Sequence, residues 1–138
     1  MKTMVYGQSE RVREWVAERV GEPFADSGVA IGVEEDGELI AGVVYNMFTG
    51  ASISMNVAAD PSKRWTKKEF MYAFFAYPFI QLKCNRVTAL IRRSNLVSKK
   101  FSEHVGFVQE GIVRQAFEDG EDAFLYGMLK SECKWIRS

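Results

Sequence analysis

The segment 67–82 constrains the fold most, because six of the ten residues from 70 to 79 are aromatic. Spread over nearly all sides of a helix, these rings predict a helix that packs on a sheet and is covered on its other flank too. Pro78 predicts a kink or an end to its regular part. Thr66 and Glu69 have the spacing of a capping box, so we expect the helix to begin at about Lys67. The six aromatic residues are Phe70, Tyr72, Phe74, Phe75, Tyr77 and Phe79.

The remaining chain alternates between helical and strand-like periodicity. An amphipathic helix is expected over 8–20, with Ser9 as its N-cap and Gly21 as its stop, and another from Asn95 to about His104. This order predicts a mixed α/β fold built on one sheet, with a further strand at the N-terminus left open. Strands are expected at 29–35, 38–48, 51–57, 86–93, 107–118 and 123–129, with Asp-Gly turns at 36–37 and 119–120.

Composition excludes several classes of protein. The 138 residues are 47% hydrophobic, enough for the core of one domain spanning 1–138. Eighteen basic residues balance eighteen acidic ones, so no overall field attracts nucleic acid or a membrane. His104 is the only histidine, which excludes a multi-histidine metal site, and Cys84 and Cys133 match no metal or redox spacing. Without a secretory signal or a bilayer-length apolar stretch, we expect a cytoplasmic protein that binds no metal and no membrane.

Four basic residues gather where the aromatic helix begins: Lys63, Arg64, Lys67 and Lys68. Cations at a helix N-terminus oppose the helix dipole unless an anion lies there, so this cluster favours a phosphate or pyrophosphate site. A solvated helix start with four basic residues is the alternative.

One face of the strand 51–57 is polar. Ser52, Ser54 and Asn56 alternate with apolar residues, and such a face must meet water, a ligand or hydrogen-bond partners. The glycine-rich loops of common dinucleotide and nucleoside-triphosphate sites are absent from the chain.

The element order and the segment 95–114 resemble the GNAT acetyltransferase superfamily. That segment carries the pattern N-x-x-S followed by G-F-x-x-E-G-x-x-R. The sequence is most similar to the branch that acetylates protein N-termini and to short phage and prophage members, which share the Tyr77-Pro78-Phe79 and Glu132-Cys133-Lys134-Trp135 stretches. The resemblance implies a mostly antiparallel central sheet of six to seven strands, with splayed fourth and fifth strands and three to four flanking helices.

The resemblance also implies acetyl-CoA as the donor, held between the splayed strands 52–59 and 86–93. The pantetheine arm would lie along the first of these strands, and the pyrophosphate at about 62–67. One difference is that the family's glycine-rich pyrophosphate loop is replaced here by Ser62-Lys63-Arg64-Trp65-Thr66-Lys67. The residues that the resemblance places against the cofactor are Val57, Ala58, Ala59, Arg64, Trp65, Thr66, Lys67, Asn95 and Ser98.

The family's reaction is direct attack of a neutral amine on the thioester, with the oxyanion stabilised by a backbone N–H near Val57. Ser102 stands where many members have a tyrosine as general acid. Glu110 and Glu118 are candidate general bases, whereas Asn56 cannot accept the proton. The candidate catalytic residues that the resemblance places at the reacting groups are Ser102, Asn56 and Glu110.

Two alternatives to an N-acetyltransferase remain open at the level of sequence. The missing glycines and tyrosine allow a catalytically silent fold that binds acyl-CoA or a protein. The clusters 63–68 and 92–93 allow a member that modifies nucleic acid, against which the zero net charge counts. Acidic residues in the loops 21–28 and 114–123 favour a cationic acceptor such as a protein N-terminus, a lysine or a small amine. Homodimers are common in the family.

Overall fold

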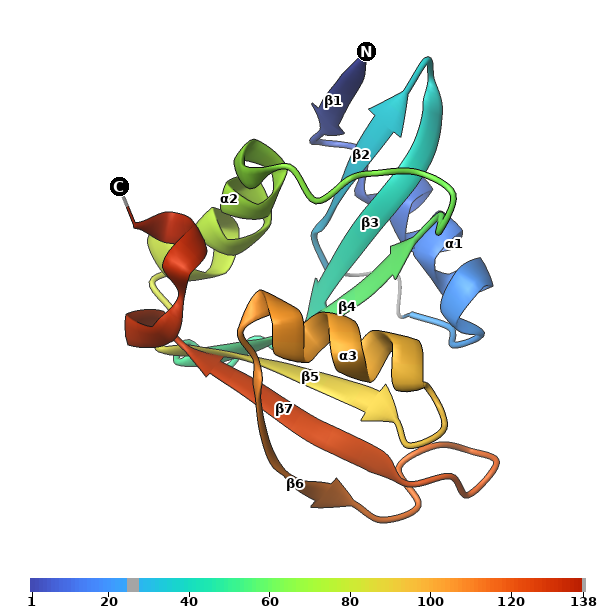
Figure 1. The fold of residues 1–138 in the computed structure, drawn as a ribbon, viewed down its shortest axis with the longest axis vertical. Helices are drawn as coiled ribbons and strands as arrows, with labels where there is room; N and C mark the ends of the chain where they lie inside the picture. The colour runs from blue at the N-terminus through green and yellow to red at the C-terminus, as the bar shows by residue number, and fades with distance from the viewer. Residues whose placement is uncertain (25–27, 138) are drawn as a thin grey trace.

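The computed structural model describes residues 1–24 and 28–137. Seven strands form one sheet in the order β1-β2-β3-β4-β5-β7-β6, and every neighbouring pair is antiparallel except β4 and β5 (Figure 1). This mixed α/β architecture with three helices confirms the predicted fold class. None of the described helices is both long and apolar enough to cross a bilayer. The strands are β1 (Lys2–Val5), β2 (Ala30–Glu35), β3 (Glu38–Asn46), β4 (Ser52–Ala59), β5 (Arg86–Arg92), β6 (Val108–Val113) and β7 (Ala123–Leu129); the helices are α1 (Ser9–Val20), α2 (Lys68–Ala76) and α3 (Leu96–Val105).

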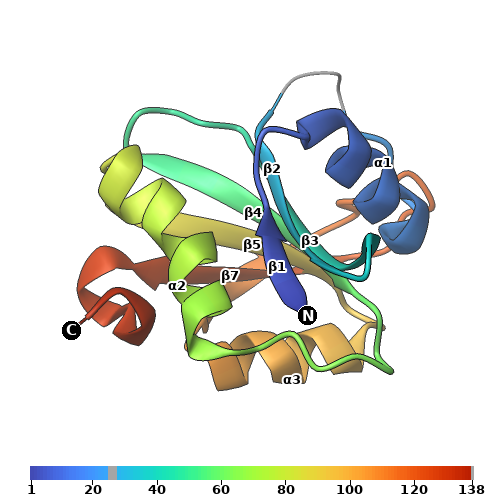
Figure 2. The same ribbon diagram turned by 90° about the horizontal axis from the view of Figure 1, so that it is seen from above.

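The sheet separates two layers of helices. Helix α1 packs on one face, whereas α2, α3 and the C-terminal turns Lys130–Glu132 and Lys134–Ile136 lie on the other (Figure 2). Alternate side chains of β3 serve the two layers, since Val43 packs on the α2 side and Val44 on the α1 side. Helix α1 lies so close to the sheet that a Cβ at Gly42 would stand 2.8 Å from a methyl group of Val16. Glycine at this position therefore allows the close approach.

The aromatic segment behaves as Pro78 predicts. Regular α-helix ends at Ala76, and the chain continues through a π-helical turn, Tyr77–Gln81, in which the N–H of Leu82 donates to the carbonyl of Tyr77. Phe70, Phe74, Phe75 and Phe79 are buried. The C-terminal turns cover one flank of α2, but Tyr72 is 46% exposed, so the expectation of cover on all sides is wrong there.

Three local predictions are corrected by the structure. Gln8 is the N-cap of α1, and the hydroxyl of Ser9 instead accepts a hydrogen bond from the N–H of Ala30. No capping box forms at Thr66, because α2 begins one residue later with Lys67 at its N-cap. The strand expected over 107–118 ends at Val113, and a loop bound to β5 by ion pairs follows it. The N-terminal strand that the sequence left open is present as β1.

Candidate functional site

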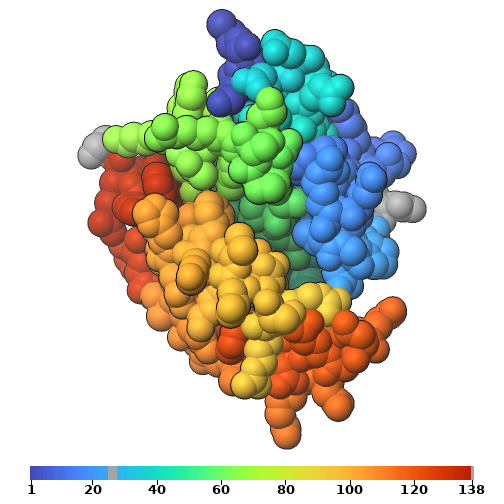
Figure 3. Space-filling model, turned by 45° about the vertical axis from the view of Figure 1, so that its right-hand side comes forward, coloured from blue at the N-terminus to red at the C-terminus, as the bar shows by residue number. Residues whose placement is uncertain are grey.

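Strands β4 and β5 separate after three paired residues. They pair in parallel from Ser52 and Arg86 as far as Ser54 and Thr88, and then diverge. From Met55 to Ala59, β4 pairs with β3 on one side and has no strand partner on the other within the described residues. This confirms the predicted splay. In the space-filling view β4 lies at the bottom of a recess between α1 in blue and α3 in gold (Figure 3).

The exposed edge of β4 carries the residues predicted to follow the pantetheine arm. Val57 and Ala59 pack against the core on the α2 side, whereas Ala58 packs on the α1 side. Along the edge that faces the recess, alternate backbone N–H and C=O groups are available for pairing. Asn56 is fixed by its neighbours, because its side-chain amide donates to the carbonyl of Val44 and to the side-chain oxygen of Asn46, both at 3.1 Å.

The loop between β4 and α2 is compact although it has no glycine. The carboxylate of Asp60 accepts hydrogen bonds from the hydroxyl and the N–H of Ser62, at 2.7 and 3.0 Å, and these bonds lower the pKa of Asp60. Lys63, predicted to belong to the basic cluster, instead pairs with Glu35 at 3.3 Å.

The basic residues that remain surround an open helix end. Arg64, Lys67 and Lys68 are exposed, as is Thr66. Within the described residues, no side-chain hydrogen bond caps α2, so its first N–H groups keep their capacity to bind an anion. The predicted anion site therefore stays a prediction, with three cations rather than four beside the helix end.

Trp65 has a different place from its neighbours. Its indole is 8% exposed and packs against Phe74 of α2 and Phe101 of α3, with ring centroids 5.7 and 5.4 Å apart. The side chain therefore anchors the loop between the two helices, and only the backbone of Trp65 is left to face a ligand. A tryptophan within a polar, charged loop was the sequence signal for this anchor.

Helix α3 presents the remaining predicted residues. Asn95 is its N-cap as predicted, and its side-chain oxygen accepts the N–H of Ser98 at 3.1 Å. Asn95 itself is exposed and Ser98 is half-buried, one turn into the helix. Ser102 lies a further turn along, on the buried side of α3, and is 8% exposed.

Glu110 does not lie free at the mouth of the recess. Its carboxylate accepts two hydrogen bonds from Arg86, at 2.7 and 3.3 Å, near the point where β4 and β5 part. The ion pair lies directly on Gly127, where a Cβ would stand 2.6 Å from both carboxylate oxygens. A glycine inside a strand often marks such a close approach, so Gly127 was an available signal that the sequence interpretation missed.

A second ionic cluster ties together segments that are far apart in the sequence. Arg92, at the end of β5, pairs with Asp119 and Glu121 at 2.9 Å and also with Glu22 of the segment that follows α1. Its guanidinium lies 4.0 Å from the ring centre of Phe117. Hydrogen bonds from the N–H of Glu121 and from Arg92 lower the pKa of Asp119, and hydrogen bonds from Ser94 and Arg92 lower that of Glu121.

This cluster changes how the loop charges are interpreted. Arg93 pairs with Asp122 at 3.7 Å, so both arginines that suggested a nucleic-acid contact have carboxylate partners. Four carboxylates, those of Glu22, Asp119, Glu121 and Asp122, face two guanidinium groups, which leaves two negative charges in excess. The acidic character predicted for these loops persists, but it is attenuated.

Neither cysteine resembles a nucleophile. Cys84 and Cys133 are buried and free, and burial raises the pKa of both thiols. Cys133 therefore acts as the packed apolar residue that the sequence predicted.

Comparisons with known proteins agree with this geometry. The structure resembles the spermidine/spermine N-acetyltransferase SpeG from Vibrio cholerae, with a TM-score of 0.71 and 16% identity over 94% of this chain and 93% of that one. It also resembles Ard1 from Thermoplasma volcanium, with a TM-score of 0.74 and 14% identity over 93% and 97%. No curated protein matches the sequence. The family model for the acetyltransferase (GNAT) domain matches residues 6–124, and the chain belongs to the GNAT acetyltransferase family.

Proposed function

We propose that this protein is an acetyl-CoA-dependent N-acetyltransferase acting on a primary amine. The observation that carries the proposal is the free edge of β4 from Met55 to Ala59, which leads to the uncapped N-terminus of α2. An extended chain of amide groups can pair with such an edge, and a diphosphate suits the helix end beyond it. Pantetheine joined to a diphosphate has this combination of groups.

Acetyl-CoA would lie along the recess, from the free edge of β4 to the N-terminus of α2. The backbone of Val57, Ala58 and Ala59 would pair with the pantetheine amides. The first N–H groups of α2, with Arg64 and Lys67, would hold the pyrophosphate, and Trp65 keeps their loop in place through its contacts with Phe74 and Phe101. Asn95 and Ser98 would border the pantetheine arm from α3, as the family resemblance implies.

The acceptor is proposed to be a cationic amine that loses its proton in the site. Two excess negative charges in the Arg92 cluster would attract such a molecule, whether a protein N-terminus, a lysine or a small amine. The neighbours named for spermidine and spermine N-acetylation are consistent with a small polyamine.

The chemistry assigned to this chain is orientation and proton transfer, while acetyl-CoA supplies an activated acetyl thioester. A backbone N–H near Val57 would stabilise the oxyanion. Asn56 would take no proton. Its side-chain amide, held by hydrogen bonds to Val44 and Asn46, would orient polar groups of the substrates. Ser102 would protonate the leaving thiolate, directly or through water, and Glu110 would accept the amine's proton, its position set by Arg86.

Calorimetric titration with acetyl-CoA and, separately, with S-acetyl-pantetheine tests cofactor binding. We expect acetyl-CoA to bind and S-acetyl-pantetheine to bind far more weakly, because it lacks the pyrophosphate. The double variant Arg64→Met/Lys67→Met should bind acetyl-CoA about tenfold more weakly, from two exposed charge contacts of about 0.7 kcal/mol each. The matched control Lys130→Met/Lys134→Met removes the same charge from the exposed C-terminal turns and should bind like the wild type.

A turnover assay that follows release of the CoA thiol tests catalysis over a panel of amines. Glu110→Gln should lower kcat by about a hundredfold, the lower range for loss of a general base, with acetyl-CoA binding unchanged. Asn95→Ala should weaken acetyl-CoA binding. If Asn95→Ala and Lys67→Ala leave turnover of every amine unchanged, the site assignment is wrong; if acetyl-CoA binds without turnover of any amine, the protein is a silent acyl-CoA-binding fold.

A further inference from the structure

Strands β4 and β5 divide the sheet into two parts where they separate. Strands β1 to β4 form one part, and β5, β7 and β6 form the other. In the residues that the structure describes, strand pairing joins the two parts only from Ser52 and Arg86 to Ser54 and Thr88. Beyond this pairing the recess opens between β4 and helix α3, which follows β5 (Figure 3). The proposed pantetheine arm, bordered by β4 and by α3, would therefore contact both parts.

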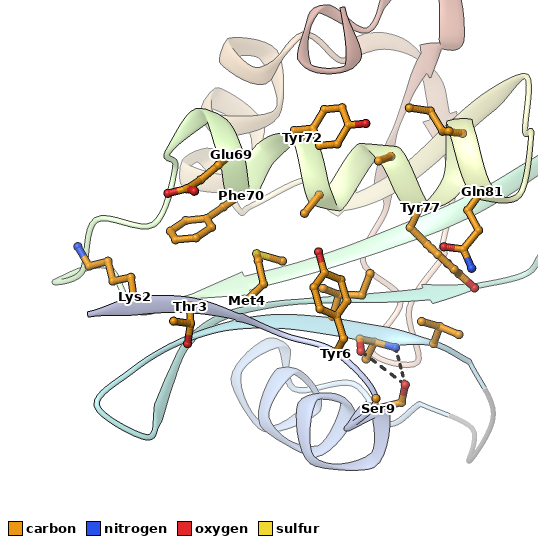
Figure 4. Close-up of a pocket in the computed structure, with 17 residues that line it drawn as sticks. Lys2, Thr3, Met4, Tyr6, Ser9, Glu69, Phe70, Tyr72, Tyr77 and Gln81 are labelled. Atoms are coloured by element: carbon orange, nitrogen blue, oxygen red, sulfur yellow. Dashed lines mark hydrogen bonds between the residues drawn. The ribbon is translucent and has the colours of Figure 1, made fainter.

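Helix α1 belongs to the part that contains β4. It contacts β2, β3 and β4, and Val16 in its middle is fully buried. At its start the hydroxyl of Ser9 accepts a hydrogen bond from the N–H of Ala30 on β2, at 3.0 Å (Figure 4). Gly21 ends the helix in a left-handed conformation, and Glu22 comes next. The position of Glu22 is therefore fixed relative to β4.

Arg92 belongs to the other part. It is the last residue of β5, and one nitrogen of its guanidinium donates to Asp119 and to Glu121 of the loop between β6 and β7, both at 2.9 Å. The N–H of Asn95, the N-cap of α3, donates to the carbonyl of Arg92 at 2.9 Å. Glu121 also accepts the N–H of Ser94 at 2.8 Å. These bonds hold Arg92 and the start of α3 together.

The ion pair between Arg92 and Glu22 connects the two parts at the open end of the recess. Side chains of β5 alternate between the faces of the sheet, and Ala89 and Ile91 pack with Phe107, the residue that follows α3 and its last turn. The side chain of Arg92 therefore lies on the opposite face, where α1 ends. The pair thus spans the gap between β4 and β5 on the α1 side, and the α3 side stays open to a ligand.

We propose that Arg92 and Glu22 are positioning residues, which set the distance between β4 and the start of α3 and thereby the fit of the pantetheine arm. The inference rests on the proposed function, because acetyl-CoA is the ligand whose two walls the pair connects. Asn95 would border the arm from α3, and the backbone of Val57 would pair with it from β4. A change in the spacing of the two walls would weaken one of these contacts.

Electrostatics and geometry predict opposite effects of removing Glu22. The phosphates of acetyl-CoA are negatively charged, so the loss of a carboxylate by itself would favour binding. The loss of the connection would weaken binding, by no more than the strength of a partly exposed ion pair, so Glu22→Ala should bind acetyl-CoA about fivefold more weakly than the wild type. Glu22→Gln keeps a side-chain oxygen that can accept from Arg92, and it should recover most of this loss.

Asp119→Ala is the matched control. Asp119 is also a carboxylate partner of Arg92, but it lies in the same part of the molecule as β5. The variant removes an equal charge without breaking a contact across the gap, so it should bind acetyl-CoA like the wild type. A double-mutant cycle with Arg92→Met identifies the pair, because Glu22→Ala should have no further effect on binding once Arg92 is removed.

Calorimetric titration of the full chain with acetyl-CoA measures these constants, and circular dichroism checks that each variant is folded. Equal binding by Glu22→Ala and the wild type overturns the inference, as does equal weakening by Glu22→Ala and Asp119→Ala, or additive effects of Glu22→Ala and Arg92→Met. The comparison of Glu22→Ala with Asp119→Ala decides by itself if Arg92→Met fails to fold. A wild type that does not bind acetyl-CoA overturns the proposed function and this inference with it, whereas wild-type binding that Glu22→Ala leaves unchanged overturns the inference alone.

Discussion

Pro78 leaves a carbonyl in the core without its usual donor, and Tyr45 supplies another. Because proline has no N–H, residue 78 cannot donate to the carbonyl of Phe74, four residues earlier. The hydroxyl of Tyr45 on β3 donates to that oxygen at 2.5 Å, and Tyr45 is 1% exposed. We therefore expect the hydroxyl to stabilise the kinked end of α2 against the sheet.

Tyr45→Phe removes the hydroxyl and keeps the ring, whose contact with Tyr77 at 4.8 Å is retained. The buried carbonyl of Phe74 then loses a donor, which should lower the free energy of unfolding by about 1–3 kcal/mol. Urea denaturation followed by circular dichroism measures this loss. The matched control Tyr72→Phe alters a tyrosine that is 46% exposed and should change stability by less than about 0.5 kcal/mol.

A double-mutant cycle with Pro78→Ala isolates the cause. The new N–H at position 78 can donate to the carbonyl of Phe74, so Tyr45→Phe should be less destabilising in that background, by about 1 kcal/mol. Equal losses in the two backgrounds, or a loss below about 0.5 kcal/mol in the wild type, would refute the reasoning.

The same substitution has a signature in alkali. Burial, with the neighbouring Tyr77 and Tyr6, raises the pKa of Tyr45 well above 10.0. The stability linked to this shift is complete below pH 10.0, the ordinary pKa, and is lost as the pH rises towards the folded-state value. Tyr45→Phe should therefore lose less stability than the wild type above pH 10.0.

Two further predictions concern the recess. Trp65→Ala should lower the free energy of unfolding by about 3–5 kcal/mol, because the buried indole packs on Phe101, and Trp65→Phe should recover part of that loss; equal destabilisation by both in urea titrations would argue against the packing role. The hydrogen bonds that lower the pKa of Asp119 and Glu121 stabilise the folded protein at pH values above the ordinary pKa values of these groups, 3.8 and 4.5. This stabilisation is lost as the pH falls through the lowered pKa values. Arg92→Met removes the hydrogen bonds from Arg92 but keeps those from the N–H of Glu121 and from Ser94. The urea midpoint of unfolding should therefore fall less steeply with decreasing pH than in the wild type. Identical slopes would contradict this reasoning.

The sequence by itself determined the elements that depend on neighbouring residues. Gly21 ends α1 in a left-handed conformation, Asn95 caps α3, and Pro78 ends the regular part of α2, all as predicted. Each of these effects acts within one helical turn, so the local pattern contains the whole cause. The GNAT resemblance supplied the splay of β4 and β5, which periodicity alone does not encode.

The tertiary structure decided which of the predicted site side chains already have partners within the protein and which remain available to a ligand. Lys63 and Glu110 were assigned to the site from sequence, but Glu35 and Arg86 pair with them. Trp65 was placed against the cofactor, and its indole packs in the core, which leaves only its backbone to face a ligand. These partners come from other elements, and residue type and spacing do not identify them.

The Arg92 cluster shows the same limit over the longest distance. Glu22 and Arg92 are seventy residues apart and meet only because β5 ends beside the segment that follows α1. The open edge of β1 also depends on the strand order, because the same four residues could equally form a strand in the middle of a sheet. Local sequence thus determined the helices, turns and strands, whereas the order and separation of the strands decided which charges pair, where the recess opens and which edge stays exposed.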